Sequence, residues 1–589
     1  MSYDAEAARK GIGLALSGGG FRAAFFHVGV LAQLAKLNLL RNVRMLSCVS
    51  GGSIAGAVYY LTLVRQLMVS DEIESGKVPA VRPQPLSDDE YASCVGTTRQ
   101  ILIAAARSNI RATVFRNPWK NVTMFLSPRY SRTDRAGDML DKRMREGVGV
   151  KTGYRYPGVK RQLELRTLHV QRPDLPRLAL NATTLNTGHA WRFETDGMGE
   201  FLPPQRRRVD KNAELRWTSY GDLPEDQANF PLAVAVAASA AFPGLFRPLP
   251  IGGLYDRRID LMDGGAQDNQ GIQTLMDVAF ADSAEPLFDR IIVSDGAGRL
   301  EDEETKRRSI VGVGRIIGIQ GDRIREEQLL AALDGFKRRG GQVDLIDLRH
   351  HLPYSTIDVD GTSTTEGGAP SLVRERLAQL RTDLDAFGAL ETNLLEQRGY
   401  EVAAEVLREA AAGASPVAEV APRSREDRVL SAGRSQFWKP LQGYRALLLV
   451  RSHKVVPLVV LAATLLAGAY GALRFFGPDP GWRRAIASVA LVVFFLLPAF
   501  ASRTLLHLAP SFSHLRWTKW LTGFVLYGVL FGLVLWQGPT VADWGELSWT
   551  KGKAAAVAGG ILLAPAVLPF FLALFMWLEG LWWKALARA

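Results

Sequence analysis

The residues best suited to chemistry lie in the stretch Val49-Ser50-Gly51-Gly52-Ser53, between two apolar runs typical of a buried strand and a packed helix. A serine on a sharp turn from strand to helix is exposed above the sheet, and the positive end of the helix favours the anion formed in acyl transfer. The usual pattern is Gly-x-Ser-x-Gly. Around Ser50 the first glycine is replaced by Cys48, and around Ser53 the last is replaced by Ala55. The stretch predicts a nucleophilic serine, with a plain Gly/Ser turn as the alternative.

A second candidate is the run Gly18-Gly19-Gly20, which lies between a predicted strand and a predicted helix. Successive backbone N–H groups at the start of a helix can bind an anion. The run lacks the Lys-Ser/Thr of a P-loop, and Ala23 stands where a Gly-x-Gly-x-x-Gly motif would end. Because a serine elbow follows it, we expect the amides of Gly18, Gly19 and Gly20 to form an oxyanion hole.

The third candidate is Asp263, which ends a predicted strand and begins the turn Asp263-Gly264-Gly265. A carboxylate at a strand end can reach a serine at the same edge of a sheet. A capping aspartate in a simple turn is the alternative. A helix rich in alanine and valine, predicted over 232–241, precedes this turn, and the order elbow, helix, Asp-Gly-Gly favours the catalytic interpretation.

The elements that must position these residues alternate along the chain, which indicates an α/β fold. Strands are predicted at 11–16, 45–49, 178–184, 259–263 and 287–294, and helices at 23–37, 54–63, 232–241 and 323–333. A long amphipathic helical pair is predicted over 372–407, with a break near Gly399. Residues 96–145 are predicted to be a helical insertion, and both a lid and a plain helical excursion remain open for it.

The composition of the chain limits the classes of function that it can have. The chain has 589 residues and a formal net charge of +12, which suits either anionic lipid or nucleic acid. No zinc-ligand spacing, basic heptad or aromatic RNA motif supports nucleic acid, so none is expected as a partner. Only Cys48 and Cys94 are present, which indicates a reducing compartment rather than a disulfide framework. Residues 1–10 lack the apolar core of a signal peptide.

The last quarter of the chain has the composition of a membrane region. Apolar runs at 455–476, 485–502, 517–536 and 554–578 each approach the ~20 residues that a spanning helix needs. Nine of the 13 tryptophans lie beyond residue 480, several near the ends of these runs, as interfacial aromatics do. Residues 410–454 are predicted to be a linker and juxtamembrane segment, and 455–589 a domain of about four transmembrane helices.

The flanking charges predict the orientation of these spans. Of the Lys and Arg residues counted in the segments that flank or connect the spans, ten lie on the side of the N-terminal domain and five on the other side. The positive-inside rule then places the N-terminal domain and the C-terminus in the cytoplasm. We therefore expect a multi-pass protein of the inner membrane.

Together these pieces resemble the patatin-like phospholipase family over about residues 10–400. Ser17-Gly18-Gly19-Gly20-Phe21-Arg22 is similar to its Asp-Gly-Gly-Gly-x-Arg oxyanion loop, and Val49-Ser50-Gly51-Gly52-Ser53 to its nucleophile elbow. Asp263-Gly264-Gly265 matches the Asp-Gly-Ala/Gly motif of the family, and residues 238–243 match its Ala-Ser-x-Ala-x-Pro segment. Ser17, Ala23 and Cys48 depart from the family pattern. The elbow looks closer to the cytosolic phospholipase branch, in which the first serine of Ser-Gly-Gly-Ser is the nucleophile.

The resemblance implies that Ser50 rather than Ser53 is the nucleophile, with Asp263 as its base in a Ser-Asp dyad. Ser50 directly ends the apolar strand, whereas Ser53 falls in the first helical turn, where it can act as a cap. An aspartate in a partly desolvated site can accept the proton of a serine. A Ser-Asp-His triad would have to use His350 or His351, which we interpret as exposed loop residues. His27 is interpreted as a packed core residue.

The resemblance further implies a three-layer α/β/α hydrolase domain, here residues 1–409, that cleaves acyl esters of membrane glycerolipids without a metal or other cofactor. Arg22 either supports the glycine loop or meets a lipid phosphate. Acyl transfer to an alcohol and a non-catalytic lipid-binding scaffold are the alternatives to hydrolysis. A homo-oligomer is left open.

Overall fold

The structure is a computed structural model of the chain, and it describes residues 11–408 apart from internal gaps. The gaps are 74–76, 116–129, 153, 157–158, 161–162, 203–206, 208, 211–214, 224–227, 244–245, 253–257, 282–285, 299–308, 351–355, 358–362 and 365–376. Contacts divide the chain into two units, Met1–Val114 with Met124–Phe437, and Phe115–Thr123 with Trp438–Ala589. Almost all described residues belong to the first unit.

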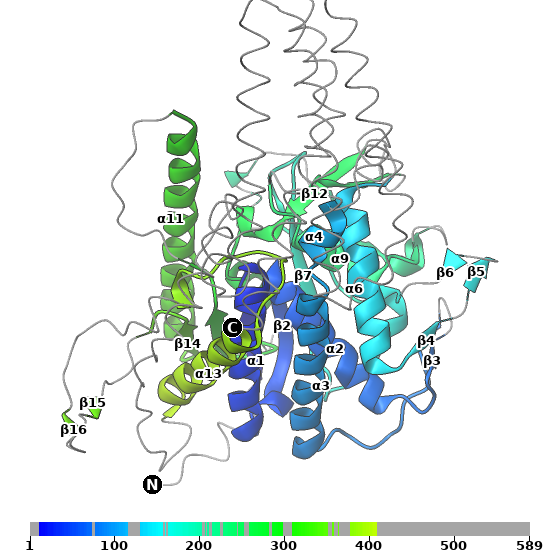
Figure 1. The fold of residues 1–589 in the computed structure, drawn as a ribbon, viewed down its shortest axis with the longest axis horizontal. Helices are drawn as coiled ribbons and strands as arrows, with labels where there is room; N and C mark the ends of the chain where they lie inside the picture. The colour runs from blue at the N-terminus through cyan, green and yellow to red at the C-terminus, as the bar shows by residue number, and fades with distance from the viewer. Residues whose placement is uncertain are drawn as a thin grey trace, which may run out of the picture. The chain divides into compact units, whose positions relative to one another are not determined.

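Strands and helices alternate in the first part of the described chain, and runs of consecutive helices and strands follow (Figure 1). In order they are β1 (Ile12–Leu16), α1 (Gly20–Lys36), β2 (Val43–Val49), α2 (Gly51–Leu67), β3 (Glu72–Ile73), α3 (Asp88–Arg107), α4 (Ile110–Phe115), α6 (Arg132–Val148), β4 (Lys151–Thr152), β5 (Tyr154–Tyr156), β6 (Val159–Lys160), β7 (Arg177–Thr184), β8 (Ala190–Phe193), β9 (Gly197–Glu200), β10 (Thr218–Ser219), α9 (Leu232–Ser239), β11 (Leu249–Ile251), β12 (Ile259–Asp263), α10 (Ile272–Ala279), β13 (Arg290–Asp295), α11 (Ser309–Arg338), β14 (Gln342–Asp347), β15 (Thr356–Ile357), β16 (Ser363–Thr364) and α13 (Ala389–Val406).

The largest sheet in the described chain has ten strands, eight of them in the order β10-β9-β8-β7-β2-β1-β13-β14. The five strands from β7 to β14 are parallel, and β8, β9 and β10 continue the sheet antiparallel. β12 pairs antiparallel with β7, and β11 with β12. Parallel strands direct their carboxyl ends to one edge of the sheet, which is where ligands bind in open α/β folds.

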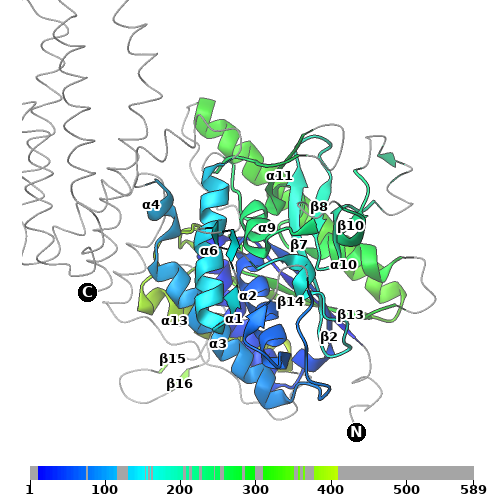
Figure 2. The ribbon, with the colours of Figure 1, turned by 90° about the vertical axis from the view of Figure 1, so that its right-hand side faces the viewer.

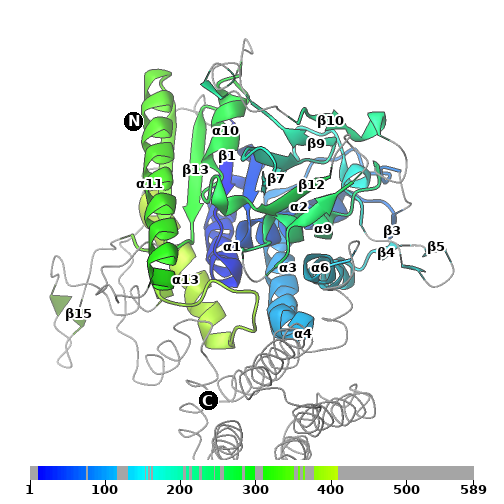
Figure 3. The ribbon, with the colours of Figure 1, turned by 90° about the horizontal axis from the view of Figure 1, so that it is seen from above.

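The apolar strands are buried on both faces because helices cover both. Ala15, Met45 and Ile291 share a core cluster with residues of α10 and α11. The alternate residues face the other way, since a side chain added at Gly56 of α2 would contact Leu16 of β1. Figure 3 shows α10 and α1 on opposite sides of β1. The prediction of an α/β domain with a central sheet and flanking helices is confirmed.

Helices α1 and α13 pack together, and this contact corrects one prediction. α13 runs without interruption from Ala389 to Val406, whereas a break was expected near Gly399. A Cβ at Gly399 would lie 2.0 Å from the carbonyl oxygen of Phe26. A Cβ at Gly29 would lie 1.9 Å from that of Glu396. The two glycines therefore mark where the helix backbones approach closely rather than where a helix ends.

The described part of the predicted 96–145 insertion packs against other helices of the domain. α3 begins at a capping box formed by Ser87 and Glu90 and buries Tyr91, Cys94 and Leu102. It packs on α1 and α2, and it lies beside α6 (Figure 2). The limits of this insertion stay a prediction, because residues 116–129 lie outside the described chain.

The predicted linker and the four predicted membrane spans also lie outside the described residues. Among the helices that the structure does describe, none combines the length and the apolar character needed to cross a bilayer. The membrane region therefore stays a prediction.

Candidate active site

Ser50 occupies the sharp turn between β2, which ends at Val49, and α2, which begins at Gly51. Its backbone has φ 50° and ψ −115°, a conformation that residues with a Cβ rarely adopt. Such strain is typical of a nucleophile elbow, and it persists only where the surroundings impose it. The Ser50 N–H donates to the Ser239 Oγ at 3.0 Å. The turn is therefore held by a partner from α9 as well as by the strand and helix that flank it.

The glycines after Ser50 permit a close approach between the elbow and the loop from β1 to α1. A Cβ at Gly51 would lie 2.1 Å from the Gly20 carbonyl oxygen, and one at Gly52 would lie 2.1 Å from that of Leu16. The Gly52 N–H donates to the Ser17 carbonyl at 3.1 Å. The two glycine motifs of the sequence thus meet in space.

Strand β7 places Asp263 beside the elbow. One edge of β7 pairs with β2 up to Val49, which lies opposite Asn181. The next residue of β7, Ala182, lies opposite Asp263 of β12. β8 occupies the other edge of β7 here, so β12 takes over the edge that β2 leaves at the elbow. The ends of β2 and β12 therefore meet on one edge of β7, which brings Ser50 and Asp263 next to each other.

The Ser50 hydroxyl donates to the Asp263 Oδ2 at 2.8 Å. The other oxygen of this carboxylate, Oδ1, accepts the Gly265 N–H at 2.8 Å. Asp263 is 5% exposed, and burial raises the pKa of its carboxyl to about 6, although the hydrogen bonds from Gly265 and Ser50 lower it. A carboxylate with a pKa near 6 can accept a proton from a serine and return it close to neutral pH.

Ser239 lies at the centre of a buried hydroxyl network behind the elbow. Its Oγ accepts the Ser50 N–H and donates to the Asn181 carbonyl at 2.5 Å. The Ser53 Oγ lies 2.7 Å from the Ser239 Oγ and donates to it, since the Ser239 proton is already directed to Asn181. Ser53 and Ser239 are both fully buried. Ser53 is therefore committed to supporting the turn, and Ser50 is the serine that reaches the carboxylate.

The predicted oxyanion loop lies against Ser50, but its three amides differ. A Cβ at Gly18 would lie 3.2 Å from the Cβ of Ser50. The Gly18 N–H donates to the Asn269 carbonyl at 2.8 Å, so the prediction for this amide is corrected. Within the described residues, the N–H groups of Gly19 and Gly20 donate to no acceptor. These two amides remain available for an anion.

Comparison with known proteins indicates a family for part of the chain. The family model described as patatin-like phospholipase matches residues 14–276, a range that contains the glycine loop, the elbow and Asp263. Residues 14–276 are therefore similar to a patatin-like phospholipase domain. No curated protein matches the chain.

Two solved structures are similar to the chain at a low level. The crystal structure of VipD from Legionella pneumophila is 11% identical, with 88% of this chain and 90% of that chain covered and a TM-score of 0.25. The crystal structure of the type III effector protein ExoU is also 11% identical, with 83% of this chain and 70% of that chain covered and a TM-score of 0.25.

The departures of this patatin-like domain from the family pattern are accommodated locally. Cys48 replaces a glycine of the elbow, and its side chain fits because Gly56 faces it: a Cβ there would lie 2.2 Å from the Cys48 Sγ. Ser17 replaces an aspartate, and its Oγ accepts the Gly296 N–H at 2.9 Å. Gly296 also leaves room for Ala23, since a Cβ there would lie 2.7 Å from the Ala23 Cα.

Arg22 of the patatin-like domain is directed into the protein. It is 2% exposed, and its Nη1 donates to the carbonyls of Ala378 and Leu380 at 2.7 and 2.8 Å. Its Nε donates to the Gly296 carbonyl at 3.2 Å. This geometry corresponds to the loop-support alternative.

His27 and His350 both have hydrogen-bond partners outside the dyad. His27 is fully buried between the Ser294 Oγ and the Ser17 carbonyl, and burial lowers the pKa of its ring to about 4. His350 follows β14, which is three strands away from β2 in the sheet. At the usual strand spacing, β14 lies roughly 14 Å from β2. Its N–H donates to the Asp347 carbonyl at 2.8 Å. His351 lies outside the described residues.

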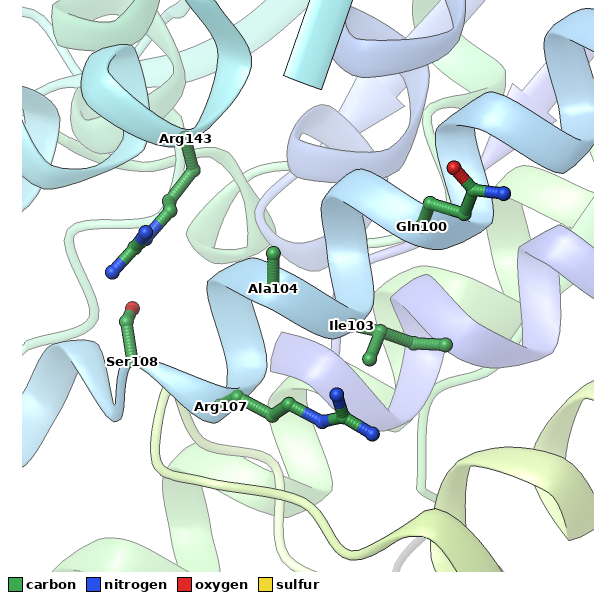
Figure 4. Close-up of a pocket in the computed structure, with 6 residues that line it drawn as sticks. All are labelled: Gln100, Ile103, Ala104, Arg107, Ser108 and Arg143. Atoms are coloured by element: carbon green, nitrogen blue, oxygen red, sulfur yellow. The ribbon is translucent and has the colours of Figure 1, made fainter. Parts of the chain in front are cut away.

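A cavity elsewhere on the patatin-like domain takes no part in this site. It has a volume of about 530 Å³ and lies between α3 and α6 (Figure 4). It is lined by Gln100, Ile103, Ala104, Arg107, Ser108 and Arg143. The guanidinium groups of its two arginines point in different directions, so they form no common anion cradle. Across the described chain, no cluster of three or more His, Cys, Asp or Glu could hold a metal ion.

Sequence reasoning missed three residues of the site. The Gly51 N–H, next to the elbow serine, is a third amide without an acceptor among the described residues. Its position directly after the serine could have indicated it, since oxyanion holes commonly use that amide. Ser239 lies in the Ala-Ser-x-Ala-x-Pro segment, but no role at the site was predicted for it. Asn269 contacts the glycine loop from a segment far away in sequence, which no local pattern reports.

Proposed function

We propose that the chain is a serine acyl hydrolase that cleaves ester bonds of glycerolipids through a Ser50–Asp263 dyad. The observation that carries this proposal is the 2.8 Å hydrogen bond from the Ser50 hydroxyl to the buried Asp263 carboxylate. The amides of Gly19 and Gly20 beside the elbow, which have no acceptor among the described residues, support it further. A lone capping aspartate would not need a strained serine beside it, so the combination favours catalysis over a plain turn.

In the first half-reaction, the Ser50 Oγ attacks the ester carbonyl while its proton passes to the Asp263 Oδ2. The carbonyl oxygen becomes an oxyanion, which the amides of Gly19, Gly20 and Gly51 stabilise. When the tetrahedral intermediate collapses, Asp263 returns the proton to the leaving alcohol oxygen. The acyl group remains on Ser50 as an ester.

In the second half-reaction, water attacks this acyl-enzyme and gives its proton to Asp263. The same amides stabilise the second oxyanion. Collapse releases the carboxylic acid, and the proton on Asp263 returns to Ser50. The Asp263 pKa of about 6 suits both directions of proton transfer near neutral pH.

Glycerolipids in a membrane are the substrate class we propose. The family supports a lipid ester, and the four apolar runs beyond residue 455 support an anchor that would hold the domain near the inner leaflet. A reporter enzyme fused after Ala589 tests the topology, and it should be active in the cytoplasm. Activity on the other side alone would contradict the proposed orientation.

The decisive experiment on the nucleophile compares Ser50→Ala with Ser53→Ala in the full chain. Ser50→Ala should abolish both hydrolysis of a short-chain ester and labelling by a fluorophosphonate. Ser53→Ala removes only a donor to Ser239, so it should keep substantial activity. Equal labelling of the Ser50→Ala protein and the wild type would refute the assignment.

Product analysis separates the alternatives to hydrolysis. An acyltransferase would pass the acyl group from Ser50 to an added alcohol, whereas a hydrolase releases free fatty acid. A non-catalytic scaffold would do neither. Nothing in the described geometry favours an alcohol over water, so we expect free acid as the main product.

A further inference from the structure

Backbone hydrogen bonds hold the oxyanion loop on both sides of the Gly19 and Gly20 amides, which have no acceptor in the part of the chain that the structure describes. On one side the Gly18 N–H donates to the Asn269 carbonyl at 2.8 Å. On the other the Phe21 N–H donates to the Asp383 carbonyl at 3.0 Å. Asp383 belongs to a segment, residues 377–385, that lies about 100 residues beyond the range matched by the family model. The second fastening therefore comes from outside the matched domain.

The contact between this segment and the loop is direct and involves backbone. A Cβ at Gly20 would lie 2.6 Å from the Asp383 nitrogen and 2.7 Å from its carbonyl oxygen. The first turn of α1 contacts the same segment, because Arg22 donates to the carbonyls of Ala378 and Leu380. The segment thus covers the end of the loop and the first turn of α1, from Gly20 to Arg22.

Buried ion pairs hold the 377–385 segment in place. The guanidinium of Arg111, on α4, forms an ion pair with the Asp383 carboxylate, and the side chains are 3% and 11% exposed. The Arg111 N–H donates to the Leu384 carbonyl at 3.1 Å. At the other end, Arg381 pairs with Glu391 in the first turn of α13. Helix α4 and helix α13 therefore clamp the segment on the loop.

The loop needs such support because it has little stiffness of its own. Gly19 has φ 139° and Gly20 has φ 58°, both in the left-handed half of the map, and glycine samples many other conformations at similar cost. An oxyanion hole is effective only if its donors are already aimed when charge develops. Alignment of the two amides must therefore come from the residues that fasten the loop.

We propose that the 377–385 segment, locked by the Arg111–Asp383 ion pair, positions the amides of Gly19 and Gly20 for the transition state. Arg111 and Asp383 are positioning residues that act through Phe21 and Gly20 and do not touch the substrate. The inference rests on the proposed hydrolase function and assigns part of that site to a segment outside the matched domain.

The test compares Arg111→Met and Asp383→Asn with a control, Arg290→Met, in the full chain. Arg290 forms a partly buried ion pair with Asp344 where β13 and β14 begin, at the opposite ends of the strands from the site. Removing one oxyanion donor costs on the order of 100-fold to 1,000-fold in kcat, so misaiming donors should cost about 10-fold. KM should change little, because the substrate ground state does not use these donors fully.

A second measurement separates positioning from general damage. A short-chain trifluoromethyl ketone forms a tetrahedral oxyanion with an active serine, so its affinity should fall by the same factor as kcat/KM. The pH midpoint of activity, set by Asp263, should stay where it is in the wild type. Arg290→Met should keep wild-type kcat and inhibitor affinity even where its melting temperature falls.

Each result decides the inference. Unchanged kcat in a folded Asp383→Asn protein overturns it, as does a loss of kcat without a matching loss of inhibitor affinity. An equal loss in Arg290→Met also overturns it. If the wild-type chain neither hydrolyses the ester nor reacts at Ser50, the proposed function fails and the inference fails with it. An active wild type with unaffected variants overturns the positioning role alone.

Discussion

Replacing Asp263 by asparagine should make the protein less active and, above pH 6, more stable. The carboxyl is buried, and burial raises its pKa from the usual 3.8 to about 6. The unfolded chain then loses this proton near pH 4 and the folded chain near pH 6. Folding therefore carries no penalty from this group at low pH, a growing penalty between the two values, and the full penalty above about pH 6.

The size of the penalty follows from the shift. One pKa unit corresponds to about 1.4 kcal/mol, so a shift of about two units costs the ionised folded state about 3 kcal/mol. Asparagine is uncharged and nearly the same size. Its Oδ1 can still accept the Gly265 N–H that now binds the carboxylate, and its amide can donate to Ser50. The free energy of unfolding of Asp263→Asn should therefore exceed that of the wild type by up to about 3 kcal/mol at pH 8.

Activity should move in the opposite direction. Asparagine cannot take the proton of the serine, and loss of a general base costs on the order of 100-fold or more. In the wild type, kcat/KM should rise with pH and reach half its maximum near pH 6, as Asp263 loses its proton. Removing the base should also remove this titration.

The assay pairs hydrolysis of a short-chain ester with unfolding of the full chain, both measured from about pH 4 to about pH 8. Asp260→Asn is the matched control, because Asp260 lies on the same strand and pairs with Arg258 near the surface. It should keep the activity of the wild type. A variant Asp263→Asn that retains a tenth of the activity, or whose stability change is the same at both ends of the pH range, would refute the reasoning.

Three further predictions concern the support of the site. Ser239→Ala should lower kcat about 10-fold and the free energy of unfolding by about 1–3 kcal/mol, because it leaves buried donors and acceptors unpaired. Steady-state kinetics and urea unfolding measure the two effects. An unchanged kcat would contradict the role of Ser239 in holding the elbow. Gly51→Ala should cost on the order of 100-fold in kcat/KM, since its Cβ would lie 2.1 Å from a carbonyl of the oxyanion loop, whereas Gly96→Ala, with open space around it, should stay fully active. Replacing His350 and His351 together by alanine should leave kcat within about twofold of wild type, and a folded but inactive double variant would establish a triad in place of the dyad.

The limits of sequence reasoning are clearest at the glycines. Gly399 was expected to interrupt a helix, because glycine is a poor helix former. It lies inside α13, where the missing side chain allows the backbone of α1 to come close. A break in a helix and a close approach between two helices both favour glycine in a sequence, since both need the absence of a Cβ. Only the neighbouring helix distinguishes them.

The same holds for the amides of the oxyanion loop. The three glycines gave equal reason to expect three donors, but the Gly18 N–H is used by Asn269. The partners that fix the loop, Asn269 and Asp383, are hundreds of residues away in sequence. Hydrogen bonds between such distant segments are set by how the sheet and helices pack, and no local pattern carries that information.

The sequence by itself determined the parts of this protein that depend on local chemistry. Strand periodicity, the Ser-Gly-Gly turn and the Asp-Gly-Gly turn located Ser50 and Asp263 at strand ends, because turns and burial leave short-range patterns. The tertiary structure decided which serine reaches the carboxylate, which amides stay free and where Arg22 is directed. Each of these depends on groups meeting across β7 or across the loop, and such meetings arise only when the chain is packed.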